Sequence, residues 1–326
     1  MPTRRDLVLA VSALPLLGAG RARGEDRVVR TGILPFGTVA WEVETVRRNG
    51  LDAARGVRVE PVRLASNEAA RIAFQSGAVD TIVSDLLFAA RLRAEGKPVI
   101  FLPYSATEGA VMVPAASPVA SVADLKGKRI GVAGGALDKS WLLLRAHAAE
   151  RFGLDLAEHA SPVFGAPPLL AEKLAAGELD AGLLYWNFCA RLEARGFRRL
   201  VEAGEIARSF GLDGDIALLG YVFDEAFGKD AARLSAFAAA SRDAKARLAS
   251  SDAAWKSLRP LMAAEDEATF EALKRAFLAG IPSRPVAAER ADAERLYAVL
   301  ARIGGEKLVG PAKNLPSGLY WGGPTG

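Results

Sequence analysis

The chain has 326 residues, of which 51% are hydrophobic, 25% are charged and one is a cysteine. One cysteine excludes an intrachain disulfide and a cysteine-based metal cluster, and about 300 residues can bury a large core without either. The formal net charge is +4, but four arginines and one aspartate fall within residues 1–24, so the remaining chain carries only +1. Without a net positive field, or a run of basic residues interleaved with aromatics, nucleic-acid binding is not expected.

Residues 1–24 have the pattern of an export signal. Arg4 and Arg5 supply a charged start, an apolar run covers residues 7–17, and small residues precede a cut before Glu25. Eleven apolar residues are too few to span a bilayer. The arginine pair followed by Asp6 also fits a twin-arginine signal. Because no cysteine follows the run as a lipid-attachment site, we expect a soluble periplasmic protein.

Short apolar runs alternate with helical segments after the signal. Apolar runs without strict alternation are typical of strands buried on both faces of a parallel sheet, so the pattern predicts an α/β fold. The expected strands in the first hundred residues are 28–34, 57–64, 79–83 and 99–102, and the expected helices are 40–49, 68–76 and 86–95.

A second α/β unit is expected to begin near residue 110. A glycine turn at Gly134 and Gly135 joins a strand to a helix there, and a second long apolar stretch, 215–223, leads the chain back. Two crossings make a hinge, so we predict lobe 1 at 25–109 with 220–326 and lobe 2 at 110–219. The remaining expected elements are strands 130–133, 161–164 and 179–184, and helices 137–152, 169–176, 231–249, 265–280 and 287–302.

Residues that follow the strands are the candidates for ligand contact, because ligands in open α/β sheets bind beyond the carboxyl ends of strands. Ser84 and Asp85 follow one strand, and residues 185–187 follow another. Asp80 and Asp180 precede these strands, so we expect them to be structural. Trp186 is predicted to stack on a ligand and Trp141 to lie in the core. Lys139 is predicted to point into solvent.

Several pieces of the chain resemble the solute-binding proteins of bacterial ABC importers, in the nitrate, sulfonate, taurine and thiamine-precursor group. The matching pieces are 75–80 leading to Ser84 and Asp85, 108–111, 122–132 and 177–181. The resemblance implies a type II periplasmic-binding fold of two lobes with a two-strand hinge. It also implies a small-molecule ligand held in the cleft by hinge closure, an ABC permease in the inner membrane as partner, and no cofactor or metal.

The same resemblance implies which residues line the pocket. We further expect the protein to act as a monomer. The expected pocket residues are Phe36, Thr38, Asn67, Ser84, Asp85, Thr107, Glu108, Gly135, Asp138, Ser140, Tyr185, Trp186 and Asn187.

The charges in these loops favour an amine, a zwitterion or a nitrogen heterocycle over a simple anion. Lys139 is the only basic residue among them, whereas Asp85, Glu108 and Asp138 are acidic. An uncompensated carboxylate facing an anion would weaken binding. An exported accessory or sensor protein on the same fold is the alternative function.

Enzyme activity is not expected. Enzymes that resemble this family in the pyrimidine-precursor branch depend on a histidine and a cysteine-rich motif. Cys189 stands alone in this sequence and neither His147 nor His159 lies in a predicted exit loop. Cys189 is instead predicted to be a small buried hydrophobe.

Overall fold

The computed structural model describes residues 27–35 and 37–323. The predicted export signal and Phe36 lie outside the described residues. None of the helices in the described ranges is both long and apolar enough to cross a bilayer.

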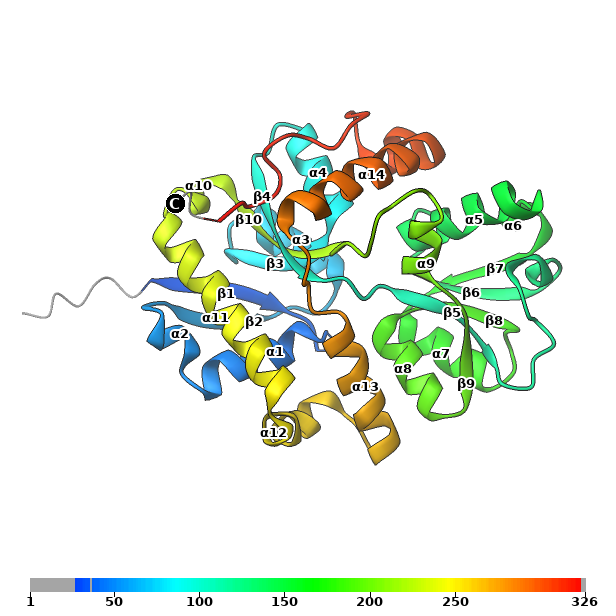
Figure 1. Ribbon diagram of the computed structural model, residues 1–326, viewed down its shortest axis with the longest axis horizontal. Helices are drawn as coiled ribbons and strands as arrows, with labels where there is room; N and C mark the ends of the chain where they lie inside the picture. Colours follow the sequence, from blue (N-terminus) through cyan, green and yellow to red (C-terminus); the bar gives the residue numbers. More distant parts are fainter. Residues whose placement is uncertain (1–26, 36, 324–326) are drawn as a thin grey trace, which may run out of the picture.

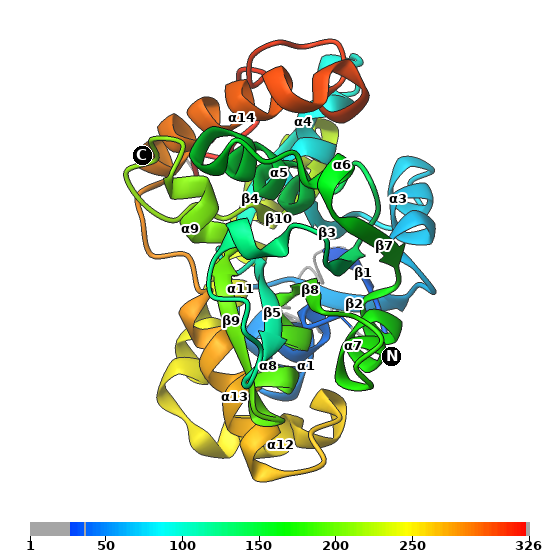
Figure 2. The same ribbon diagram turned by 90° about the vertical axis from the view of Figure 1, so that its right-hand side faces the viewer.

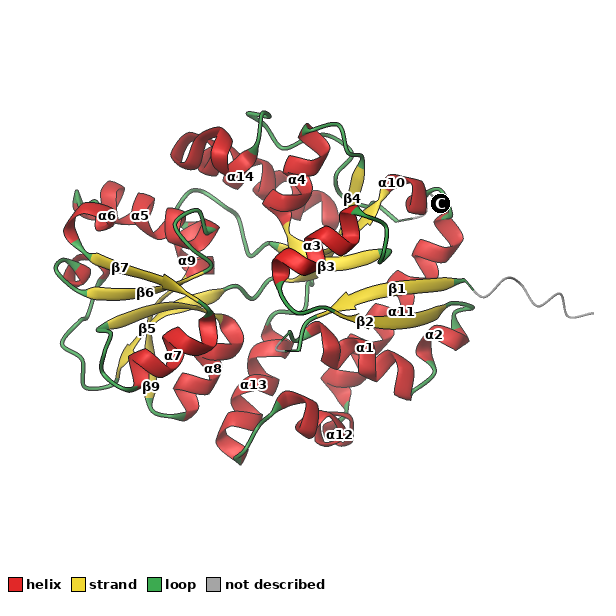
Figure 3. Ribbon diagram, turned by 180° about the vertical axis from the view of Figure 1, so that it is seen from behind, coloured by secondary structure: helices red, strands yellow, loops and turns green. Residues whose placement is uncertain are grey.

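Two five-stranded sheets lie side by side, each covered by helices (Figures 1 and 3). In the first sheet the order is β2-β1-β3-β10-β4, with β1 parallel to β2 and β3 and with β10 antiparallel to β3 and β4. Its strands are β1 (Val28–Ile33), β2 (Arg58–Arg63), β3 (Thr81–Asp85), β4 (Val99–Ser105) and β10 (Leu219–Asp224).

The second sheet repeats the pattern with the order β7-β6-β8-β5-β9. Strand β6 is parallel to β7 and β8, and β5 is antiparallel to β8 and β9. These strands are β5 (Gly109–Pro114), β6 (Arg129–Ala133), β7 (Ser161–Gly165), β8 (Ala181–Tyr185) and β9 (Phe197–Glu202). The predicted two-lobed α/β architecture is therefore confirmed. The strand assignment supports the predicted lobe limits, which we keep as a proposal for the position of the hinge.

Most of the helices connect successive strands, and those after β10 pack around the first sheet. In the first part of the chain they are α1 (Val39–Arg48), α2 (Leu51–Ala54), α3 (Asn67–Gln75), α4 (Leu86–Ala94) and the 3-10 helix η1 (Val122–Leu125). Next come α5 (Lys139–Phe152), α6 (Leu156–His159), α7 (Pro167–Ala175), α8 (Trp186–Ala194) and α9 (Ala203–Arg208). The remainder are α10 (Glu225–Gly228), α11 (Ala231–Ser250), α12 (Asp252–Met262), α13 (Glu267–Ala279) and α14 (Val286–Val309).

Several elements differ from the sequence prediction. Strand β9 and helices α8, α9 and α12 were not predicted, and Trp186 and Asn187 begin helix α8 instead of lying in a loop. Strand β9 is only half-buried along its length, so its sequence lacks the apolar run that marks a central strand. The last helix continues beyond the predicted end at 302, with a break at Gly305 where φ is 58°.

An internal repeat places an arginine and an aspartate at equivalent positions in the two sheets. Asp80 accepts hydrogen bonds from the backbone and side chain of Arg30 on β1, and Asp180 accepts the same set from Arg129 on β6. Both carboxylates fasten neighbouring strands at the start of the strand. This confirms that Asp80 and Asp180 are structural.

The two lobes also touch through helices. Helix α13 packs on α8, and α14 packs on α5; Figure 2 shows α13 beside α8 on one side of the molecule and α14 above α5 on the other. The indole of Trp186 lies 6.0 Å from that of Trp41 on α1 and 6.4 Å from the Phe277 ring on α13. Aromatic contacts therefore join the lobes beside the two crossings.

Candidate functional site

A cleft of about 410 Å³ lies where the carboxyl ends of β1, β3, β6 and β8 meet. In open α/β sheets this edge is where ligands bind, since the helices that follow the strands begin there and the connecting loops are free to vary. Both lobes contribute to its lining, and Gly37, Asp85, Gly134 and Tyr185 represent the four strand exits.

Nine of the predicted site residues line this cleft. They are Thr38, Asn67, Ser84, Asp85, Glu108, Asp138, Tyr185, Trp186 and Asn187. The exit loops of both lobes thus converge on one space.

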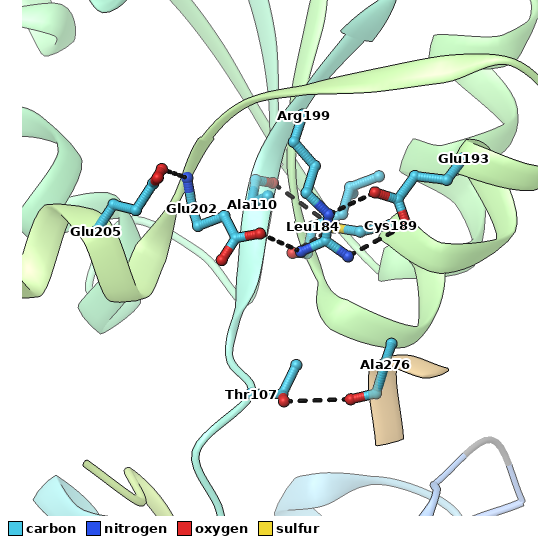
Figure 4. Close-up of polar contacts among 9 residues, drawn as sticks. All are labelled: Thr107, Ala110, Leu184, Cys189, Glu193, Arg199, Glu202, Glu205 and Ala276. Atoms are coloured by element: carbon cyan, nitrogen blue, oxygen red, sulfur yellow. Dashed lines mark hydrogen bonds and ion pairs between the residues drawn. The ribbon is translucent and has the colours of Figure 1, made fainter. Parts of the chain in front are cut away.

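Three predicted residues do not line the cleft. The Thr107 hydroxyl donates to the carbonyl of Ala276 on α13, 3.3 Å away (Figure 4), so it serves the interface between the crossing and α13. Ser140 lies in the first turn of α5, with its backbone N–H bound to Asp138. Gly134 lines the cleft in place of Gly135. Gly134 has φ of 93°, and a Cβ there would lie only 2.7 Å from the Asp138 carboxylate, so this position requires a glycine.

Asp138 is the N-cap of α5. One carboxylate oxygen accepts hydrogen bonds from the backbone N–H groups of Ser140 at 2.9 Å and Trp141 at 3.3 Å. The other oxygen lies against Gly134, at the cleft surface beside the Tyr185 hydroxyl. The residue therefore caps the helix with one oxygen and presents the second to the cleft.

Lys139 is buried, contrary to the sequence prediction. Its side chain is only 11% exposed, and its ammonium lies 2.5 Å from a carboxylate oxygen of Glu108, itself 5% exposed. A lysine can be buried when an ionised partner compensates its charge. The pair joins the first crossing to the start of α5.

Asp85 repeats the arrangement of Asp138 in the other lobe. One of its oxygens caps α4 by accepting from the backbone of Phe88 at 2.9 Å. The other accepts from the guanidinium of Arg71 on α3 at 2.8 Å, and that guanidinium also stacks over the Phe88 ring. Arg71 therefore neutralises Asp85 at the rim of the cleft.

Burial and mutual repulsion shift the pKa values of the acids in the cleft. Burial raises the pKa of Glu108, with smaller contributions from Asp138 and Asp85, against the lowering effect of Lys139. Burial likewise raises the pKa of Asp138. Burial alone would lower the pKa of Lys139, but Glu108, Asp138 and Asp85 together raise it above its ordinary value. Burial and the charge of Asp138 raise the pKa of Tyr185 to about 12, so its hydroxyl stays protonated.

Sequence reasoning missed five polar residues of the cleft, of which Glu68 is the neighbour of the predicted Asn67. Arg71, Arg91, Tyr104 and Lys307 also line the cleft, although none follows a strand directly. Arg71 lies one turn beyond Asn67 on the predicted helix, so helical spacing could have revealed it. The other three could not be placed without the packing of β4, α4 and α14.

Cys189 is fully buried below the cleft, as predicted. Its thiol contacts the carbonyl oxygens of Leu184 and Ala110 at 3.3 and 3.7 Å (Figure 4), and burial raises its pKa to about 12. The thiol is therefore neutral and unreactive at ordinary pH.

The fold and the cleft define a two-lobed solute-binding protein. The sequence model of a family described as ABC transporter, phosphonate, periplasmic substrate-binding protein matches residues 48–212, just over half of the chain. The chain belongs to this family of periplasmic substrate-binding proteins, which confirms the family of ABC importer components expected from the sequence. No curated protein matches the sequence.

Solved structures show the same fold in binding proteins and in an enzyme. The aliphatic sulphonate binding protein of Escherichia coli has a TM-score of 0.70 and 17% identity, covering 91% of this chain and 92% of that one. The alkanesulfonate-binding protein of Xanthomonas axonopodis pv. citri, bound to MOPS, has a TM-score of 0.68 and 18% identity, covering 91% and 99%. The desulfurization enzyme DSZB, with a TM-score of 0.57 and 18% identity over 89% and 97%, shows that the fold also occurs in an enzyme.

Proposed function

We propose that the protein captures a small zwitterionic solute, with an amine or protonated nitrogen heterocycle as its cationic group, for delivery to an ABC permease. The observation that carries the proposal is the capping of two helix N-termini at the cleft, those of α4 and α5, by carboxylates. A free helix N-terminus attracts anions through its unpaired N–H groups. Here Asp85 caps α4 and Asp138 caps α5, so carboxylates already occupy the donors that an anion would use at these two N-termini. Helices α1 and α8 also begin at the cleft and have no side-chain cap.

The remaining charges favour a cation at this end of the cleft. Asp138 and Glu108 share the single ammonium of Lys139, and the Arg71 guanidinium pairs with Asp85. An incoming ammonium would gain from the partly uncompensated carboxylates, whereas an anion would be repelled. The pKa values of Glu108 and Asp138 are raised chiefly by burial, and the neighbouring carboxylates raise them further.

The opposite charge of the solute has partners on α4 and α14. Arg91 and Lys307 line the same cleft, and Arg91 follows the N-cap Asp85 by six residues, which is about 9 Å along a helix axis. The solute is therefore placed with its acidic group near Arg91 and its amine near Asp138, both of which line the cleft.

Matched pairs of solutes test the proposal. Calorimetric titration would compare 2-aminoethanesulfonate with ethanesulfonate, and 2-aminoethylphosphonate with ethylphosphonate. We expect the amino compound of each pair to bind at least tenfold more tightly, since it alone places a cation against the carboxylates. Equal or tighter binding of the compounds without an amine would overturn the proposed ligand class.

Asp138→Asn provides the variant test. Asparagine caps a helix nearly as well as aspartate, so the fold should persist while the affinity for the amino compounds falls by about tenfold. Asp266→Asn is the matched control, because Asp266 caps α13 through Thr269 and does not line the cleft. If both variants bound these compounds as tightly as the wild type, Asp138 would not be the cation partner.

We also propose that the protein is exported by its first 24 residues, that it binds as a monomer and that it does not transform its solute. Membership of a family of binding proteins supports these statements. Recovery of an intact solute after release from the protein, by mass spectrometry, tests the last of them.

A further inference from the structure

Tyr104 on β4 carries a buried hydroxyl without a hydrogen-bond partner. The residue is 3% exposed and lines the cleft, and no group in the described part of the chain bonds its Oη. The hydroxyl of Thr38 lies close enough to lower the Tyr104 pKa, against the larger raising effect of burial, but does not make a bond of normal geometry. An unsatisfied buried hydroxyl destabilises the solute-free protein.

The surroundings of Tyr104 hold its ring in place. The Lys245 ammonium on α11 lies 4.6 Å from the ring centroid, and the Tyr221 ring on β10 packs edge-on at 5.4 Å. Lys245 is itself paired with the buried carboxylate of Glu42 on α1. That carboxylate also accepts from Tyr221 at 2.9 Å and from Ser241 at 2.6 Å.

Within this network, only the Tyr104 hydroxyl lacks a hydrogen-bond partner among the described residues. Glu42, Lys245, Ser241 and Tyr221 bond one another, so each polar group is satisfied within the lobe. The cation–π contact of the Lys245 ammonium with the Tyr104 ring favours this position of the ring. The ring is thus held in place, and Tyr104 lines the cleft.

A second unpartnered atom lies in the same cleft. The Glu108 Oε1 oxygen is buried without a hydrogen bond, while Oε2 holds Lys139. Tyr104 supplies a donor and Glu108 an acceptor, and the two lie four residues apart along the first crossing. Such a pair fits a solute that carries both an acceptor oxygen and an N–H donor.

We infer that Tyr104 is a specificity-determining residue whose hydroxyl donates a hydrogen bond to an oxygen of the bound solute. The inference rests on the proposed function, since it assigns a lobe-1 donor for the acidic group of the zwitterion. The Lys245–Glu42 pair acts as the positioning group that holds the ring. Binding then satisfies a group that the free protein leaves unbonded, which favours the bound form.

The test compares Tyr104→Phe with Tyr297→Phe. Tyr297 is equally buried, but its hydroxyl already donates to the carbonyl groups of Val309 and Ala312. Removing an unsatisfied hydroxyl leaves stability unchanged or higher, whereas removing a satisfied one lowers the Tm by about 2–4 °C. We therefore expect Tyr104→Phe to keep or raise the Tm of the solute-free protein, and Tyr297→Phe to lower it.

The binding measurement uses 2-aminoethanesulfonate and 2-aminoethylphosphonate. We expect Tyr104→Phe to bind them about tenfold more weakly than the wild type, and Tyr297→Phe to bind them equally well. Unchanged affinity of Tyr104→Phe, or a Tm loss equal to that of Tyr297→Phe, would overturn the inference. If neither compound binds the wild type, the proposed ligand class fails, and the Tm comparison alone decides whether the hydroxyl is free for a solute.

Discussion

The carboxylates of the cleft carry the pH dependence of the molecule. Asp138 and Glu108 have pKa values raised above the ordinary range near 4, chiefly by burial. An ionised carboxylate attracts an ammonium group and a protonated one does not. As the pH falls, these two acids take up protons earlier than exposed carboxyl groups would, and the attraction for a cationic solute is lost at that point.

We predict that affinity for 2-aminoethanesulfonate falls as the pH is lowered toward the raised pKa values, and that binding in this range releases protons. Titration calorimetry in two buffers of different ionisation enthalpy measures both quantities. Asp138→Asn should flatten the profile, because one of the two titrating groups is gone. An affinity that rises on acidification would indicate that the cleft selects an anion.

At the scale of single residues, the sequence predicted cleft-lining side chains correctly where the residue stands at the end of a strand. Ser84, Asp85 and Tyr185 line the cleft because the strand end alone sets their place. Lys139 was misjudged because its burial depends on Glu108, which lies 31 positions earlier in a different element. Trp186 lines the cleft yet is 5% exposed, and its edge-on contact with Trp41 comes from the other lobe. Contacts of this kind have no local signal.

Among the elements, strand β5 depends on a glycine. Gly109 has φ of 148°, and a Cβ there would lie 2.0 Å from the carbonyl oxygen of Leu184 on β8. The neighbouring Glu108 carbonyl accepts from the backbone of Trp186 at 3.2 Å, so the close approach also sets where α8 begins. Only a residue without a side chain permits this pairing at the crossing between the lobes.

Gly109→Ala is therefore predicted to destabilise the protein by more than about 3 kcal/mol, because the backbone of β8 cannot yield as a flexible side chain would. Gly127→Ala is the control: Gly127 also has a positive φ, of 74°, but no atom lies within 4 Å of a Cβ placed there. That variant should lose only about 1 kcal/mol. Urea unfolding followed by circular dichroism measures both, and equal losses would show that the close approach is not required.

The order of the helices and strands, and the limits of the long helices, were the features of the fold that the sequence predicted best. Helices α5, α11 and α13 lie within two residues of their expected limits, since each carries a periodic apolar stripe with glycine or a polar cap at its ends. Strand β9 and helix α9 were missed because charged residues interrupt both, and because β9 is held by its pairing with β5 and α9 by its packing on α5. Sheet order was not predicted from periodicity, and it requires the long-range pairing of β10 between β3 and β4.

For the whole molecule, the question is how the lobes move. On one side they are joined by the two crossings and by α13 packed on α8, where Trp186, Trp41 and Phe277 form an aromatic contact. We expect this side to act as the pivot, because opening there would expose buried rings to water. The cleft then opens and closes at the ends of α3 and α7.

Two engineered cysteines can measure this motion. Ile72 on α3 is 68% exposed and Leu169 on α7 is 55% exposed, so both positions accept dyes without disturbing the core. Cys189 is buried with a raised pKa and will not compete for a maleimide. In Ile72→Cys/Leu169→Cys labelled with a fluorescent donor and acceptor, energy transfer should increase when 2-aminoethanesulfonate binds.

The control pair is Ile72→Cys with Leu261→Cys on α12. Leu261 is 39% exposed and belongs to the same predicted lobe as Ile72, so rigid-body closure leaves their separation unchanged. A rise in transfer for the first pair alone is the signature of hinge closure around the solute. Equal changes in both pairs would indicate a rearrangement within lobe 1. No change in either pair, with binding confirmed by calorimetry, would mean that the cleft is already closed before the solute enters and that the aromatic contact is a fixed joint.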